Sequence, residues 1–170
     1  MKKLKEESFY LNKEFNSIIT DIINNDSFQK MKNITHHGIT RFNHSLRVSY
    51  YTYLVTKKLR LNYKEATRAA LLHDFFTDEV NKDMSIFKLR RHPKHALMNA
   101  SKYFYLSDLQ KDIISTHMFP ITFTPPKYLE SWLVDIIDDI CAIYEKLYSV
   151  RKELRAASTF LFIVIMNYIK

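Results

Sequence analysis

The chain has 170 residues, a mass of 20.4 kDa and a net charge of +8, so it has the size of one domain with a substantial core. Hydrophobic residues make up 46% and charged residues 26%, which argues against a disordered or membrane-embedded protein. Its single glycine, Gly38, argues against β-sandwiches, dinucleotide-binding domains and P-loop ATPases, because these folds depend on glycine turns. We therefore predict an all-α fold, a compact bundle of about seven helices without a sheet, formed by residues 1–170 as a single domain.

Hydrophobic residues at intervals of three and four predict helices along most of the chain. The predicted helices cover approximately residues 15–22, 42–60, 63–76, 94–105, 107–116, 128–149 and 152–169. The third of them turns Ala66, Ala69 and Ala70 inward, and these small side chains allow another helix to approach just before His73. Three prolines mark residues 119–127 as a loop, which we expect to form part of a lid over a site.

The charge and the single cysteine indicate the compartment and the partner. A basic chain favours an anionic partner such as a nucleotide, a nucleic acid or a membrane surface, although an AT-rich genome produces the same lysine-rich composition. Cys141 has no cysteine to pair with, which fits a reducing cytosol. The most apolar run, residues 156–169, is shorter than the roughly 20 residues that span a bilayer, and it predicts a buried C-terminal helix. We expect a cytoplasmic protein.

Two carboxylates fall within apolar segments. Asp74 follows His73 at the end of the run Ala-Leu-Leu, and Asp138 lies between Val134 and Cys141. A buried carboxylate without a partner costs several kcal/mol. A divalent cation would compensate it, and imidazole with carboxylate suits Zn, Mn, Fe or Ni, whereas Mg and Ca prefer oxygen ligands.

An ordered set of histidines and aspartates resembles the signature of the HD-domain superfamily of metal-dependent phosphohydrolases, over about residues 35–145. The matching residues are His44, His73-Asp74, His92-Pro93, His117 and Asp138. The segment Thr-Arg-Phe-Asn-His-Ser-Leu-Arg-Val at 40–48 is similar to the first-histidine motif of the deoxynucleotide-triphosphate hydrolases of this superfamily. The histidines at 92 and 117 look like the extra ligands of its two-metal branch, as in the diadenosine-tetraphosphate hydrolases.

The resemblance implies two divalent transition-metal ions, drawn from Mn, Fe, Zn or Ni. The first ion would be held by His44, His73, Asp74 and Asp138. Asp74 would also reach the second ion, which His92 and His117 complete. Two such ions activate water for attack on a phosphoester or phosphoanhydride, and Asp74 is then also catalytic.

The spacing of the residues adds a condition and leaves alternatives open. Adjacent helical residues point about 100° apart, so His73 and Asp74 flank one cation only at a helix end. His95 lies three residues from His92 and competes for the same site, although a helix that starts at Pro93 favours His92.

The aspartates near the C-terminal end of the matching region raise a similar question. Asp135 lies three residues before Asp138 on the same helix face and competes with it as a ligand. Asp139 points elsewhere, and we expect it to be solvated.

Further positions are predicted to touch the substrate or to act in catalysis. Arg41 resembles a phosphate clamp of the triphosphate hydrolases, with a surface arginine as the alternative. His37, beside a turn at the only glycine, and His95 are further substrate-binding candidates. Asp78 resembles a catalytic acid of the alarmone hydrolases, but Thr77 replaces the acidic residue that precedes it there.

The substrate indicated by these features is a small nucleotide, such as a mononucleotide, a dinucleoside polyphosphate or a small pyrophosphate. The chain is too short for the extra helical lobes of the triphosphate hydrolases, and it lacks the glycine-containing motif of the cyclic-di-GMP hydrolases. Two alternatives remain at this point. One is a non-catalytic basic module that binds nucleic acid, and the other is a di-iron oxygenase on the same fold.

Overall fold

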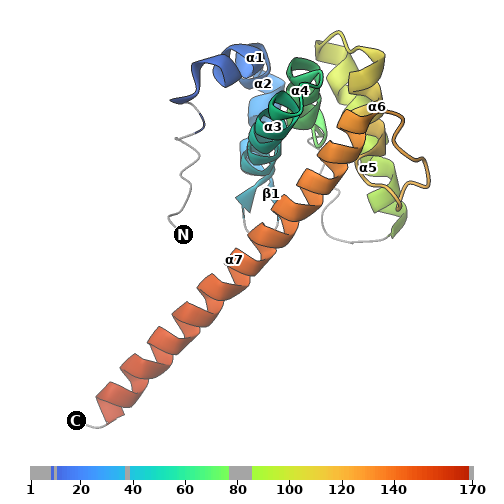
Figure 1. The fold of residues 1–170 in the computed structure, drawn as a ribbon. Coiled ribbons are helices and arrows are strands. Elements are labelled where there is room, and N and C mark those ends of the chain that lie inside the picture. The colour runs from blue at the N-terminus through green and yellow to red at the C-terminus, as the bar shows by residue number, and fades with distance from the viewer. Residues whose placement is uncertain (1–8, 10, 37–38, 77–85, 169–170) are drawn as a thin grey trace.

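The computed structural model describes residues 9, 11–36, 39–76 and 86–168. Its elements in chain order are α1 (Lys13–Ile23), α2 (Asp26–Gln29), the short 3-10 helix η2 (Lys30–Asn33), β1 (Thr35–His36), β2 (Ile39–Thr40), α3 (Arg41–Lys58), α4 (Tyr63–Leu72), α5 (Ile86–Tyr103), α6 (Asp108–Thr116) and α7 (Leu129–Tyr168). Figure 1 shows α1 to α6 gathered into a bundle, from which α7 extends. The described part of the chain thus has seven α-helices, and the predicted all-α class is confirmed.

A two-stranded antiparallel sheet corrects the prediction that the chain has no sheet. Thr35 pairs with Thr40 and His36 pairs with Ile39, so each strand is two residues long. The pairing places Thr40 as the N-cap of α3, where its hydroxyl accepts a hydrogen bond from the backbone N–H of Asn43. Residues 37 and 38, and with them the predicted glycine turn, lie outside the described residues.

Helix α4 lies at the centre of the bundle and packs against α1, α3 and α6. Its Ala66, Ala69 and Ala70 are fully buried, as predicted for a face that other helices approach closely. The predicted apolar stripe of α1 is buried as well. Because α4 ends at Leu72, four residues earlier than predicted, His73 and Asp74 follow the helix end. This is the position that one cation requires of two adjacent ligands.

Helix α5 corrects a second prediction. It begins at Ile86 rather than near residue 94, so Pro93 lies inside the helix and does not start it. A proline inside a helix removes one backbone hydrogen bond and usually marks a boundary. Here Pro93 is buried and α5 packs against α6, so tertiary packing outweighs the local preference.

Helix α7 is one continuous helix of 40 residues, where two helices were predicted. Residues 149–152 contain neither glycine nor proline, so nothing in the sequence breaks the helix there. The N-terminal part of α7 packs against α3 and α6, and the C-terminal part extends away from the bundle (Figure 1). Of the run that was predicted to be buried, Ala157 and Ser158 are exposed, and the other side chains of the run lie outside the described residues. No helix in the described ranges has the length and apolar character needed to cross a membrane.

Candidate metal centre

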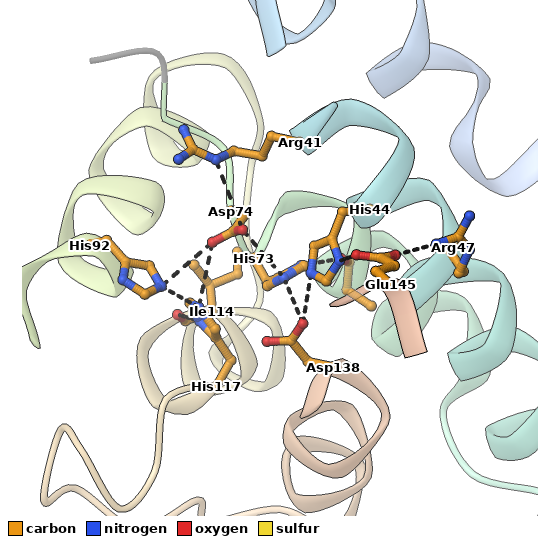
Figure 2. A network of polar contacts seen from close by, with 11 residues as sticks. Arg41, His44, Arg47, His73, Asp74, His92, Ile114, His117, Asp138 and Glu145 are labelled. Carbon is orange, nitrogen blue, oxygen red and sulfur yellow. Dashed lines mark hydrogen bonds and ion pairs between the residues drawn. The ribbon is translucent and has the colours of Figure 1, made fainter. Parts of the chain in front are cut away.

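Two histidines occupy equivalent positions at the ends of two helices. His73 is the C-cap of α4 and His117 is the C-cap of α6. The Nδ1 atom of His73 lies 2.7 Å from the carbonyl oxygen of Ala70, and that of His117 lies 2.9 Å from the carbonyl oxygen of Ile114. A carbonyl oxygen only accepts, so each Nδ1 carries a proton and donates it. In the neutral form, each Nε2 therefore presents a lone pair to the space between the helices (Figure 2).

Helices α3 and α7 contribute a third histidine and its carboxylates. The Nδ1 atom of His44 lies 2.9 Å from Oε2 of Glu145, and its Nε2 atom lies 2.8 Å from Oδ1 of Asp138. Burial opposes the charged imidazolium, but the two carboxylates outweigh this effect and raise the pKa of His44 to about 10. Without a metal, a proton therefore bridges His44 and Asp138, and a divalent cation can take the place of that proton.

Asp74 lies between the histidines and faces them with both oxygens. Its Oδ1 atom is 3.5 Å from Nε2 of His92 and 3.7 Å from Nε2 of His117. Its Oδ2 atom is 3.9 Å from Nε2 of His73 and 4.0 Å from Nε of Arg41. Burial disfavours the ionised form, yet the neighbouring histidines keep the pKa of Asp74 well below its ordinary value. One carboxylate thus faces two separate groups of nitrogen atoms.

The imidazoles of His92 and His117 approach each other directly. Their Nε2 atoms are 2.9 Å apart, on the left of the network in Figure 2. Burial, together with the charge of the surrounding histidines, lowers the pKa of His117 to about 3, and burial also lowers the pKa of His92. Two neutral imidazole nitrogens at this distance need a proton or a cation between them.

The chemistry of these donors fits a transition-metal site. Three overlapping groups place one ligand atom from each residue within 4.8 Å of the others: His44, His73 and Asp74; His73, His117 and Asp138; and Asp74, His92 and His117. Within the described ranges, no group forms a hydrogen bond with the buried Nε2 atom of His73, which lies 3.5 Å from Oδ1 of Asp138. Imidazole nitrogens mixed with carboxylates suit Mn, Fe, Zn or Ni better than Mg or Ca. The structure therefore brings all six predicted ligands together.

The structure also distinguishes the competing positions. His92 lies in the cluster, whereas His95 is exposed on α5 and belongs to none of the three groups found among the described residues. Asp135 is likewise outside those groups. It is buried near the backbone of Phe119, and burial together with repulsion from the neighbouring aspartates raises its pKa to about 7. Asp139 is exposed, as predicted.

Arg41 is buried beside the cluster, which makes the alternative of a surface arginine wrong. Its side chain is only 2% exposed, and its Nη1 atom donates a hydrogen bond of 2.9 Å to the carbonyl oxygen of Phe76. The guanidinium stacks on the Phe76 ring at 3.7 Å and adds a positive charge next to Asp74. Its role as a phosphate clamp stays a prediction. The other two predicted positions, His37 and Asp78, lie outside the described residues.

Glu145 is part of the site and was missed by the sequence analysis. It is 3% exposed and accepts hydrogen bonds from Nδ1 of His44 and from the guanidinium of Arg47. Hydrogen bonds of this kind set the tautomer and the ring orientation of metal-binding histidines. The signal in the sequence is its position seven residues after Asp138, which places both carboxylates on the same face of α7.

The comparison with family models gives one match, to the HD domain, over residues 41–143. Comparisons with curated proteins and with solved structures gave no significant match. The matched segment covers more than half of the chain and contains all six clustered residues. The chain therefore belongs to the HD domain family.

Proposed function

We propose that the protein is a metal-dependent phosphohydrolase that cleaves a phosphoester or phosphoanhydride bond of a small nucleotide. The HD domain belongs to a superfamily of metal-dependent hydrolases, which supports this reaction class. The observation that carries the proposal is the convergence of imidazole Nε2 atoms from His44, His73, His92 and His117 on two buried carboxylates. A nucleic-acid-binding module would not need such a cluster in its core.

The site holds two divalent ions in this proposal, because Asp74 faces nitrogen atoms with both of its oxygens. On the side of Oδ2, Asp74 acts together with His44, His73 and Asp138. On the side of Oδ1, it acts together with His92 and His117. When bound, such ions supply Lewis-acid activation of water and neutralise the charge of a phosphate group.

The protein's own residues hold these ligands in position. The carbonyl oxygens of Ala70 and Ile114 fix the tautomers of His73 and His117, and Glu145 fixes that of His44. Arg41 balances the charge of Asp74, and we propose that its guanidinium also binds a phosphate oxygen of the substrate. The net charge of +8 favours the approach of an anionic nucleotide.

The experiment that tests this function is an assay of the full chain, reconstituted with Mn²⁺, against mononucleotides, dinucleoside polyphosphates and small pyrophosphates. We expect phosphate release from at least one of them, and we expect His92→Ala to lower the rate by orders of magnitude. His95→Ala is the matched control for metal content, since it removes the same side chain one turn away on an exposed face. Absence of hydrolysis by fully loaded protein would contradict the proposal, and oxygen uptake by the iron-loaded protein would indicate a di-iron oxygenase.

A further inference from the structure

The outward face of α7 carries an apolar residue at strictly alternating intervals of four and three. These residues, here called the outer seam, are Leu129, Leu133, Ile136, Ile140, Ile143, Leu147, Val150 and Leu154. From Ile136 onward, each of the six is between 46% and 66% exposed. The opposite face of the same helix is the one that enters the bundle, with Val134, Asp138 and Glu145 buried. The outer seam is therefore a second apolar stripe, which stays largely exposed in the part of the chain that the structure describes.

The sequence continues this pattern to the end of the helix. Ala157, Leu161, Val164 and Tyr168 follow in the sequence at the same intervals and extend the outer seam to twelve positions, which repeat every 3.5 residues on average. A repeat of 3.5 rather than 3.6 residues is typical of a left-handed coiled coil. The 40 residues of α7 correspond to about 60 Å of helix, much of it extending from the bundle in Figure 1. A long helix with an exposed apolar stripe gains stability when a partner helix packs against that stripe.

We propose that the outer seam forms an antiparallel coiled coil with the outer seam of a second copy of this chain. In an antiparallel pair centred on the middle of α7, Leu147 lies opposite Val150 of the second copy, and Leu129 lies opposite Tyr168. The two helices then overlap over their whole length, and every seam position meets an apolar residue. The 3.5-residue repeat of the outer seam continues through this alignment without an inserted or missing residue.

The charged residues beside the outer seam favour this orientation. In a parallel pair, Lys146 would lie next to Arg151 of the second copy, which is a like-charge contact. In the antiparallel pair, Lys146 lies next to Glu153 of the second copy, and the two-fold axis repeats this ion pair. Tyr144 then lies beside Arg151 of the second copy, which allows a cation–π contact. The charges beside the outer seam thus favour the antiparallel over the parallel pair of two copies.

Sedimentation equilibrium of the metal-loaded full chain, at a series of micromolar concentrations, tests the proposal. We expect a species of twice the 20.4 kDa chain mass. Leu147→Glu places two charges in the middle of the apolar seam and should raise the dissociation constant of the dimer at least about 100-fold. Tyr148→Glu is the matched control, because Tyr148 is 46% exposed but lies off the seam, and its dissociation constant should stay close to that of the parent.

Charge reversal tests the direction of the pair. Lys146→Glu should weaken the antiparallel dimer by about tenfold, and the double variant Lys146→Glu/Glu153→Lys should restore it. In a parallel pair, Lys146→Glu would instead strengthen the dimer by removing a repulsion.

Several results would overturn the proposal. One is a parent protein that is monomeric at all concentrations, and another is a Leu147→Glu variant that associates like the parent. A third is a monomer that cosediments with vesicles of anionic lipid, because a membrane surface would then be the occupant of the outer seam. Metal content and helical circular dichroism of each variant show that it is folded. The result does not depend on the proposed reaction.

Discussion

The clearest test of how the protein holds its metal ligands is the substitution Glu145→Gln. Glu145 is buried on α7 and accepts hydrogen bonds from His44 and Arg47, which are both donors. Glutamine has nearly the same shape, but it offers one acceptor oxygen and one NH₂ group. One of the two donors must therefore face another donor, and the negative charge between them is lost.

The magnitude follows from these two contacts. Hydrogen bonds to charged groups contribute about 1.5–3 kcal/mol each, and glutamine retains only one of them in a neutral form. We expect the free energy of unfolding to fall by about 2–4 kcal/mol. The imidazole of His44 also loses the carboxylate that orients it and makes its Nε2 atom more basic. Loss of such a partner typically lowers metal affinity by about 10- to 100-fold.

Metal affinity is measured by titration with Mn²⁺ or Zn²⁺ against a chelating dye, and stability by urea unfolding. Asp21→Asn is the control, because it removes an exposed carboxylate on α1 that also pairs with an arginine, Arg68, and that belongs to none of the clustered groups found among the described residues. It should leave metal affinity unchanged. A Glu145→Gln protein that is less stable but binds metal as tightly as the parent would refute the reasoning, because Glu145 would then support only the fold.

Three further predictions concern neighbouring residues and the metal itself. Arg41→Lys keeps a positive charge beside Asp74 but loses the planar fork, so KM for the nucleotide should rise several-fold while metal content, measured by elemental analysis, stays constant. Asp135 has a pKa raised to about 7, so its ionisation destabilises the folded state as pH rises from the ordinary value of 3.8 through 7. Asp135→Asn should therefore raise the melting temperature more at pH 8 than at pH 5.5. The corresponding gain in the free energy of unfolding is about 1–2 kcal/mol, because bound metal cancels part of the repulsion from Asp138. Loss of metal in this variant would instead make Asp135 a ligand. Chelation should lower the melting temperature of the loaded protein, since ions bound only by the folded state stabilise it, and an unchanged value would argue against a buried centre.

Part of the site is encoded by local sequence pattern. The apolar run before His73 marks the end of a helix, and a carboxylate among apolar residues, such as Asp138, requires a buried partner. The other three clustered residues, His44, His92 and His117, follow only from the resemblance of their order along the chain to the HD-domain signature. The all-α class follows in the same way from helical periodicity and the lack of glycine.

The remaining features depend on contacts between distant segments. The structure places His92 in the cluster and His95 outside it, but the reason given for preferring His92 is wrong, because Pro93 lies inside α5 and does not start the helix. Glu145 acts through His44, about a hundred residues away, and no local rule links the two. The continuity of α7 was missed although the sequence carries a local signal for it. The apolar residues of the outer seam repeat every 3.5 residues without interruption, and one continuous helix follows from that repeat.

The most direct test of the central claim is the metal stoichiometry of the reconstituted parent and of two variants, measured by elemental analysis. If Asp74 joins two ions, the parent binds about two equivalents, Asp74→Ala binds almost none, and His92→Ala retains about one, held by His44, His73, Asp138 and Asp74. Helical circular dichroism should be preserved in all three. Parent-like metal content in Asp74→Ala, or no metal in the reconstituted parent, would contradict the account.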